Sequence, residues 1–318
     1  MSLLSPGRGL RRASYKQMLR LGNDTPFIIN AKLQDEVSIG ITLNAQATSR
    51  KVSINQNICS SDQLTEYCSI LWLTPLMDRL FLGAASDRCR FLDRLVLSID
   101  PVHGKRIRDC DKLVRSRTQL LQETHIKNKL LDSYEANIAL LAVEISIARR
   151  KLIELLQQII EVSNQDGFSV KSNVYLKCDV YDLLKSYGEG QTQELVTEKL
   201  YNNRISDKIS HRCNFGIHKA DLCVEHKNKN IPANLCSTGE QKALLFNLIF
   251  SQASLCQQVT NQSPILLLDE IGAHFDSEKR YNMLNKLYNY PSQVIMTGVA
   301  KELFTAIDSK AQFINLSV

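Results

Sequence analysis

The segment Pro264-Ile265-Leu266-Leu267-Leu268-Asp269-Glu270 is an apolar run that ends in two carboxylates. A short run of this kind is typical of a buried central strand. In open α/β sheets, ligands bind at the carboxyl ends of the strands, so the run predicts a site at its end. There Asp269 would hold Mg²⁺ directly or through water, and Glu270 would polarise an attacking water. The alternative is that the two acids only begin a solvated loop.

A second motif, Ser237-Thr238-Gly239-Glu240-Gln241, lies upstream of this strand. Ser237 followed by Glu240 three residues later is a capping box, which predicts a helix that starts here and runs towards Gln257. A helix start offers backbone N–H groups, a hydroxyl and a glycine that lets an anion approach closely. The alternative is a helix cap with no ligand.

The last third of the chain, Ile231–Val318, alternates between helical and apolar strand patterns. We expect a short loop, a helix, the strand that ends at Asp269, a helix, a second strand over Gln293–Met296, and a final helix and strand. Strands that alternate with helices indicate βαβ units and a largely parallel sheet.

The first third is rich in β patterns. Between Pro26 and Asn57, apolar residues recur at every second position in three runs, which predicts consecutive antiparallel strands. The apolar segment Ile70–Pro75 follows, and the next residues to Asp100 predict two short helices. This β-rich part and the α/β tail are expected to fold together.

The middle stretch, Lys105–Asp166, contains neither glycine nor proline. Within it, apolar residues follow one another at alternating steps of four and three, which is the seam that two helices need in order to pack lengthwise. The seam consists of Tyr134, Ile138, Leu141, Ile145, Ala148, Leu152, Leu155 and Ile159. We therefore expect a helical hairpin or lobe packed against the rest of the chain rather than a long free coiled coil.

Composition excludes several classes of protein. The chain has 318 residues, of which 44% are hydrophobic, and only 13 are glycine and 7 proline, which excludes a mainly disordered chain. No apolar run is long enough for a membrane-spanning helix. The nine cysteines are odd in number and include no C-x-x-C pair, as in a reduced, cytoplasmic protein.

The net charge of +6 permits a polyanionic partner without requiring one. A basic run near the start has the spacing of a surface that contacts phosphates, and a solvated face is the alternative. Its members are Arg8, Arg11, Arg12, Lys16 and Arg20.

The Ser237–Gln241 motif and the apolar strand ending in Asp269-Glu270, in this order and spacing, are similar to the C-terminal half of ABC-type ATPases. Their amino-acid sequences resemble the RecF family of bacterial recombination mediators. Other segments resemble the same family along essentially the whole chain. They are Ser5–Arg11, Trp72–Pro75, the Arg-Cys-Arg-Phe-Leu-Asp motif at 88–93, the Gly-Ile-His-Lys-Ala-Asp-Leu motif at 216–222, and Leu266–Asp276.

The resemblance implies an α/β fold: an ABC-type ATPase head, with a mixed sheet and an antiparallel β subdomain, and an inserted helical lobe. The expected parts are residues 1–97 (the N-terminal part of the head), 98–230 (the lobe) and 231–318 (the C-terminal part of the head). A chromosome-organising SMC-like ATPase is disfavoured, because it would need far longer coiled-coil arms than Lys105–Asp166 supplies.

The resemblance also implies a function: an ATP-dependent DNA-binding protein of replication, recombinational gap repair and the SOS response. Its cofactors would be ATP and Mg²⁺. Its partners would be single-stranded DNA or a single-strand/duplex junction, a second copy of the chain bound in an ATP-dependent way, and RecR- or RecO-type mediators.

Individual roles follow from the same resemblance. The segment Ser237–Gln241 would bind the nucleotide of the opposite subunit, and Asp276 would be the acid of the D-loop. Thr297 and His274 are candidate sensors, although a capping role for His274 is as well supported. His218 belongs to a family motif, but a structural histidine is the commoner outcome for such a residue.

Departures from the family pattern limit these expectations. The 318 residues contain no G-x-x-x-x-G-K-[ST] phosphate loop, which in the family would precede Ser5. Leu76 stands where a polar Q-loop residue is expected, and Cys89 replaces the second arginine of the 88–93 motif. The alternative function is therefore a nucleotide-independent protein that binds DNA or a partner and has no ATPase activity.

Overall fold

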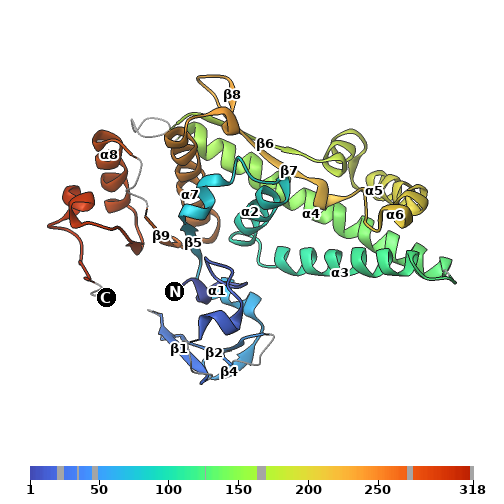
Figure 1. Cartoon of the computed structure of the whole chain (residues 1–318), viewed down its shortest axis with the longest axis horizontal. Coiled ribbons are helices and arrows are strands. Elements are labelled where there is room, and N and C mark those ends of the chain that lie inside the picture. The colour runs from blue at the N-terminus through green and yellow to red at the C-terminus, as the bar shows by residue number, and fades with distance from the viewer. Residues whose placement is uncertain are drawn as a thin grey trace. The chain divides into compact units, whose positions relative to one another are not determined.

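The structure is a computed structural model that describes residues 1–19, 25–33, 36–44, 49–125, 127–162, 170–270 and 275–315 (Figure 1). The chain packs as two units. Unit 1 contains Met1–Asp78 and Leu245–Val318, and unit 2 contains Arg79–Asn164 and Val170–Leu244. The three-part division at residues 97/98 and 230/231 stays a prediction.

Unit 1 contains a four-stranded antiparallel sheet in the order β1-β2-β3-β4. Its strands are β1 (Phe27–Lys32), β2 (Ser38–Leu43), β3 (Lys51–Ile54) and β4 (Asn57–Cys59). The three predicted strands are confirmed. The fourth was not predicted, because β3 turns into β4 through Asn55 and Gln56, which have positive φ angles of 48° and 69° without the glycine that usually marks such a turn.

The second sheet of unit 1 is parallel and has the order β10-β9-β5. Its strands are β5 (Ile70–Leu73), β9 (Ile265–Leu268) and β10 (Val294–Met296). The predicted apolar strand is thus the central one, with Leu267 opposite Trp72 on one side and Ile295 on the other. The predicted parallel sheet is confirmed.

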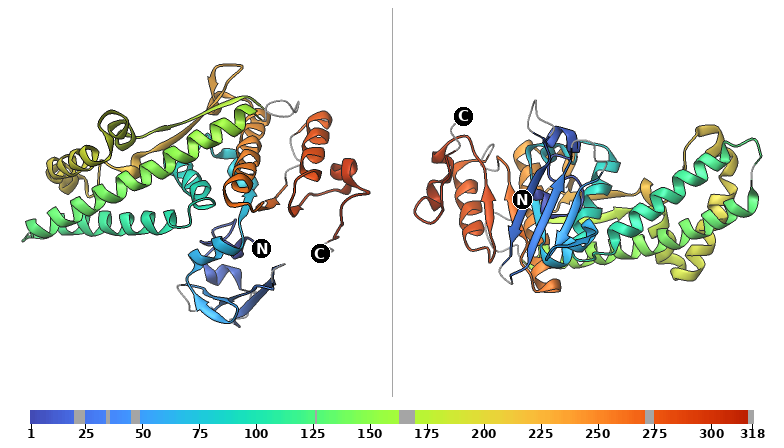
Figure 2. Two further views of the ribbon diagram at one scale, coloured as in Figure 1. Left: turned by 180° about the vertical axis from the view of Figure 1, so that it is seen from behind. Right: turned by 90° about the horizontal axis from the view of Figure 1, so that it is seen from below.

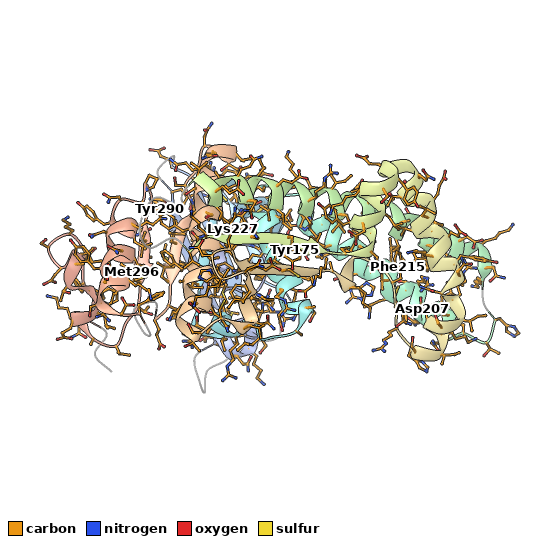
Figure 3. All side chains as sticks on the ribbon, turned by 90° about the horizontal axis from the view of Figure 1, so that it is seen from above. Tyr175, Asp207, Phe215, Lys227, Tyr290 and Met296 are labelled. Atoms are coloured by element: carbon orange, nitrogen blue, oxygen red, sulfur yellow. The ribbon has the colours of Figure 1, made fainter. Side chains whose placement is uncertain are left out.

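Two helices flank β9 in the sequence: α7 (Thr238–Thr260) and α8 (Ser277–Tyr288). After α8, the Tyr290 hydroxyl donates a hydrogen bond to the Pro264 carbonyl at 2.8 Å and so ties the end of α8 to the start of β9. Figure 3 labels Tyr290 and, on β10, Met296.

The expectation for the final segment was wrong in part. The predicted helix is the 3₁₀ helix η7 (Lys301–Ile307), and within the described residues, which end at 315, no strand follows it. The segment 308–315 is mostly polar, and its only large apolar residues are Phe313 and Ile314. The Phe313 ring packs against the Phe304 ring instead of joining a sheet.

The core of unit 1 joins both sheets. Leu4, Ile41, Trp72 and Leu267 belong to one buried cluster and come from η1 (Ser2–Leu4), β2, β5 and β9. The remaining short elements are η2 (Tyr15–Met18), η3 (Ser61–Gln63), α1 (Leu64–Tyr67) and η4 (Pro75–Arg79).

Unit 2 is built on helices, with one small antiparallel sheet in the order β6-β7-β8 (Figure 2). The helices are α2 (Ala85–Leu97), α3 (His103–Leu121), α4 (Asn128–Val162), α5 (Asp179–Asn202), α6 (Arg204–Ser210), η5 (Ile217–Lys219) and η6 (Ala233–Leu235). The strands are β6 (Ser172–Lys177), β7 (Asp221–His226) and β8 (Ile231–Pro232). The predicted helical hairpin is α3 with α4. The second of the two short helices expected before Asp100 is α2, whereas the first is only the 3₁₀ turn η4.

The buried seam of α4 differs from the predicted one. Only Ile138, Ile145 and Leu152 of the predicted seam are fully buried. The buried residues at steps of four and three are Leu131, Glu135, Ile138, Ala142, Ile145, Arg149, Leu152 and Leu156. The seam is rotated because two of its positions are charged and are buried as ion pairs, which a hydrophobic pattern cannot reveal.

Candidate functional site

The carboxyl end of the parallel sheet brings Asp269 and Thr297 together. The Thr297 hydroxyl donates to Asp269 Oδ1 at 2.6 Å and accepts from the Glu270 backbone N–H at 3.1 Å. Thr297 is held there because its own N–H bonds to the Leu268 carbonyl, which continues the β9–β10 ladder. One hydroxyl therefore fixes both the side chain of Asp269 and the backbone of Glu270.

Glu270 has a left-handed backbone, with φ of 51°, and its side chain is exposed. A glutamate in this conformation turns the chain sharply away from the strand, which is uncommon outside functional sites and tight turns. Asp269 is half-buried, and its backbone N–H donates to the Leu73 carbonyl of β5 at 2.9 Å. The two acids thus project from the end of the central strand, as the sequence predicts.

Other residues predicted around this edge are placed as follows. Asp276 is the N-cap of α8 and accepts from the Lys279 N–H at 2.8 Å, a bond that lowers the pKa of its carboxyl together with the ion pair to Lys279 Nζ at 3.0 Å. Leu76, which stands where a polar Q-loop residue is expected, follows β5. Its side chain is apolar but 77% exposed to solvent. His274 lies outside the described residues.

The start of α7 has the predicted capping box. Glu240 Oε2 accepts from both the Ser237 N–H and the Ser237 hydroxyl at 3.0 Å, and the Glu240 N–H points back to Ser237 Oγ at 3.4 Å. Ser237 and Thr238 are exposed, and Gly239 is half-buried. Gln241 is buried, and its amide donates to the Cys236 carbonyl at 2.8 Å, so this residue shapes the turn before the helix.

Glu240 is also paired with Lys229 of the β7–β8 turn. This hydrogen bond, with those from Ser237, lowers the pKa of Glu240 to about 2. The carboxylate is therefore ionised at neutral pH and stands at the positive end of the α7 dipole, a favourable location for a negative charge. Lys229 balances that charge, so the helix start is not strongly negative overall.

The basic run near the start of the chain is exposed in unit 1. Arg8, Arg11, Arg12 and Lys16 all reach solvent, and the Arg8 guanidinium lies over the Tyr15 ring at 5.8 Å. Arg20 lies outside the described residues. The placement agrees equally with a phosphate-contacting surface and with a solvated face.

The two remaining family motifs meet inside unit 2. Arg88 of the 88–93 motif forms a two-point ion pair with Asp221 of the 216–222 motif, at 2.6 and 2.9 Å. Cys89 is buried against the Ile217 carbonyl, and burial raises the pKa of its thiol to about 11. His218 bonds through Nε2 to the Cys213 carbonyl at 2.8 Å, as expected of a structural histidine.

Asp93 is the centre of this cluster. It accepts from Arg149 Nε and Nη2 at 2.8 and 2.9 Å, and its Oδ1 lies 2.9 Å from His103 Nε2. Burial alone would raise the pKa of Asp93, but the hydrogen bonds from His103 and Arg149 lower it overall. Arg149 also donates to the Ile217 carbonyl at 2.9 Å. Sequence analysis identified neither Arg149 nor His103, because a hydrophobic pattern does not mark a charged or polar residue as buried.

The described residues contain no group of three or more His, Cys, Asp or Glu side chains arranged to hold a metal ion. They also contain no helix that is long and apolar enough to cross a membrane.

A parallel sheet whose central strand ends in Asp-Glu, an antiparallel β subdomain and a helical insertion give the chain the α/β fold of an ABC-type ATPase head. Comparisons with known proteins agree. The chain is 40% identical over 322 residues to "DNA replication and repair protein RecF" of Brucella abortus (strain 2308), covering 100% of this chain and 84% of the relative. It is 39% identical over 323 residues to the protein of the same name from Rhizobium johnstonii, covering 100% of this chain and 86% of the relative. The chain belongs to the RecF family.

A solved structure shares this fold. It is described as "Structure of the recombination mediator protein RecF-ATPrS in RecFOR pathway", with a TM-score of 0.80 and 18% identity, covering 94% of this chain and 82% of that one. No family model matches the chain.

Proposed function

We propose that the chain is an ATP-dependent DNA-binding protein that acts in DNA replication, recombinational gap repair and SOS induction. The observation that carries this proposal is the strand end at which Thr297 holds Asp269 and the backbone of Glu270. The names of the relatives support it, since they are DNA replication and repair proteins. A similar solved structure is described as RecF-ATP, which supports the nucleotide.

Mg²⁺ and ATP fit the donors at this edge. Thr297 occupies Asp269 Oδ1, so the Mg²⁺ ligand would be Asp269 Oδ2, with phosphate and water oxygens supplying the rest. When bound, Mg²⁺ neutralises charge on the transferred phosphoryl group. Glu270 would orient and deprotonate the attacking water, and Thr297 would keep both acids in place and act as a sensor of the nucleotide.

The second half of the site would come from a second copy of the chain. In this proposal, Ser237, Thr238 and Gly239 present a hydroxyl and first-turn N–H groups to the γ-phosphate across the dimer. Glu240 and Gln241 act as positioning residues, because both are bonded to neighbours at the helix start. Dimer closure would hold DNA, and hydrolysis would release it.

The basic run Arg8, Arg11, Arg12 and Lys16 is the proposed DNA contact in unit 1. Its arginines and lysine suit the phosphate backbone of a single strand or a junction, so binding would be independent of sequence and sensitive to salt. Further proposed partners are RecR- or RecO-type mediators, and the proposed location is the cytoplasm.

The experiment that tests this function is a Glu270→Gln substitution in a fusion that supplies a G-x-x-x-x-G-K-[ST] segment at the N-terminus. The variant should still bind ATP and accumulate as dimers in gel filtration, because binding does not need the base. Its hydrolysis should be at least about 10²-fold slower. Near-normal turnover would remove Glu270 from this role.

A second candidate function is nucleotide-independent binding of DNA or a partner protein. It concerns these 318 residues taken by themselves, which contain no phosphate loop, the segment that normally makes the main contacts to the β- and γ-phosphates. For the chain alone we expect negligible ATPase activity and weak ATP affinity. Micromolar ATP binding in calorimetry would exclude this second candidate and show that other residues bind the phosphates.

A further inference from the structure

Helix α3 of unit 2 has a basic stripe along one face. Lys105, Arg108, Lys112 and Arg115 are all exposed and follow one another at steps of three, four and three residues. Residues at this spacing lie on one side of a helix. We call these four residues the α3 stripe. Gln119 and Gln122, both exposed, continue the same face at the next two steps.

The opposite face of α3 fixes the direction in which the stripe points. Cys110 and Arg117 are buried, and they lie about half a turn around the helix from the stripe. Arg117 is fully buried and bonds to Glu135 of α4 at 2.8 Å and to Asp207 of α6 at 2.7 Å. Figure 1 shows α3 along one edge of unit 2, and Figure 3 labels Asp207. The helix therefore cannot rotate to bury its basic side without breaking this network.

The C-terminal half of the stripe borders a groove of about 480 Å³. Arg115, Arg212, His211 and His218 supply its basic side chains. Lys219, next to His218, is exposed as well. The segment before β7, which includes the first residues of the 216–222 family motif, thus adds cationic groups to those of α3.

Acidic residues near the stripe lie on its flanks. Asp109 and Asp111 are exposed members of α3 and sit roughly a quarter of a turn to either side of the stripe. Partial loss of water around the Asp111 carboxyl raises its pKa, and Arg115 and His218 lie close enough to oppose that shift. The stripe and groove therefore keep an excess of positive charge.

We propose that the α3 stripe and this groove form a DNA-binding surface that contacts the phosphate backbone of duplex DNA. The inference rests on the proposed DNA-binding function and adds a site in unit 2 that is separate from the basic run at Arg8–Lys16. Positive charge arranged in a line matches a polyanion whose own charges are arranged in a line.

The absence of aromatic side chains selects the duplex over a single strand. Proteins that bind single strands stack bases on aromatic rings, and α3 and the described lining of the groove contain no Phe, Tyr or Trp. The ten residue steps from Lys105 to Arg115 span about 15 Å of helix, or about four base-pair steps. Because the proposed contact is to phosphates and not to base edges, it carries no base specificity.

The test uses the full chain without nucleotide. Fluorescence anisotropy measures its affinity for a 30-base-pair duplex and for a 30-nucleotide single strand over a series of salt concentrations. The stripe variant is Lys105→Gln/Lys112→Gln/Arg115→Gln. The matched control, Lys151→Gln/Lys171→Gln/Lys185→Gln, removes the same charge from other exposed positions of unit 2. Melting temperatures confirm that both variants are folded.

The stripe variant should bind the duplex at least about tenfold more weakly than the wild type. Its slope of log K against log salt should fall by about 3, since three phosphate contacts are lost. The control should lose much less, and single-strand binding should change less than duplex binding.

Two negative outcomes are distinguishable. If the wild-type chain binds DNA but the stripe variant binds the duplex as tightly as the control variant does, the proposed surface is wrong. An acidic protein would then be the alternative partner for the stripe. If the wild type binds no DNA even at low salt, the proposed surface is wrong, whereas the ATP-dependent function is tested separately by Glu270→Gln in the phosphate-loop fusion.

Discussion

Two regions of the molecule contain charged residues of the family motifs, and they use them in opposite ways. Around α2 and β7 in unit 2, Asp93 and Asp221 are paired with arginines inside the protein. At the end of β9 in unit 1, Asp269 is held by a neutral hydroxyl and Glu270 reaches solvent. An acid that is paired with an arginine contributes to folding, whereas Asp269, which accepts from a neutral hydroxyl, is the acid that we expect to serve a ligand.

The difference also concerns geometry. The Asp93 cluster joins residues of α2, α3, α4 and η5, so removing one member leaves several groups unsatisfied. The strand-end pair is local, because β9 and β10 are adjacent and a single threonine makes both bonds. Substitutions should therefore affect stability in the first region and ligand binding in the second.

The largest effect is expected for Arg149→Met. Arg149 is 1% exposed and binds Asp93 and the Ile217 carbonyl, so its loss leaves a carboxylate without its cation. We expect a loss of about 3–5 kcal/mol in the free energy of unfolding, measured by urea denaturation. The control is the next residue, Arg150→Met, whose pair with Glu154 at 3.7 Å is on the surface and should cost less than about 1 kcal/mol. Equal effects of the two substitutions would contradict the structural role of the cluster.

A smaller effect is expected for Thr297→Val. The exposed hydroxyl makes two hydrogen bonds, and its loss should lower the free energy of unfolding by about 0.5–1.5 kcal/mol. Thr297→Ser keeps the hydroxyl and should restore most of the loss. Thermal melts of the three proteins measure this, and a serine variant as unstable as the valine one would show that the methyl group, not the hydroxyl, is what matters.

Ser237 distinguishes a helix cap from a nucleotide contact. As a cap, Ser237→Ala should cost about 1 kcal/mol and Ser237→Asp almost nothing, since aspartate caps equally well. In the fusion that carries a phosphate loop, the order should invert for ATP-driven dimerisation, because aspartate places a negative charge against the γ-phosphate. Dimer fraction and melting temperature are measured on the same samples. Equal dimerisation by the wild type and Ser237→Asp would reduce the motif to a cap.

The smallest effect is a pH dependence at Glu240. Its pKa is lowered from 4.5 to about 2 by Lys229 and Ser237, so its ionised form is favoured by folding. A lowered carboxyl pKa stabilises the fold above pH 4.5, and this contribution is lost as the pH falls towards 2. The melting temperatures of the wild type and Glu240→Gln should therefore differ most near neutral pH and converge below pH 4.5. A difference that widens on acidification would show that another group is responsible.

Local patterns were sufficient for the elements that carry the site. The apolar run to Leu268 followed by two acids specified the central strand and its exposed end, and Ser237 with Glu240 specified the start of α7. Alternation of side chains likewise specified β1, β2 and β3. In each case the signal lies within a few neighbouring residues, which is the range over which sequence patterns report structure.

Long-range pairing could not be predicted in this way. Arg149 and Asp93 are 56 residues apart in the sequence, and Arg88 and Asp221 are 133 apart, so nothing local marks them as partners. Arg149 and Glu135 count as polar in a hydrophobic pattern. The predicted seam of α4 is therefore rotated around the helix axis relative to the face that is buried in the structure. The two hydrogen bonds of the Thr297 hydroxyl could not be predicted, because they depend on β10 lying beside β9; the sequence had suggested only that Thr297 is a candidate sensor.

The central claim is that Asp269, not Asp93, is the acid that serves a ligand. The most direct measurement is the ATP affinity of the phosphate-loop fusion by calorimetry, with and without Mg²⁺, for the wild type, Asp269→Asn and Asp93→Asn. Mg²⁺ should increase the ATP affinity of the wild type and of whatever fraction of Asp93→Asn is folded, but not that of Asp269→Asn, which should melt close to the wild type. An equal increase by Mg²⁺ in Asp269→Asn and the wild type would contradict the account.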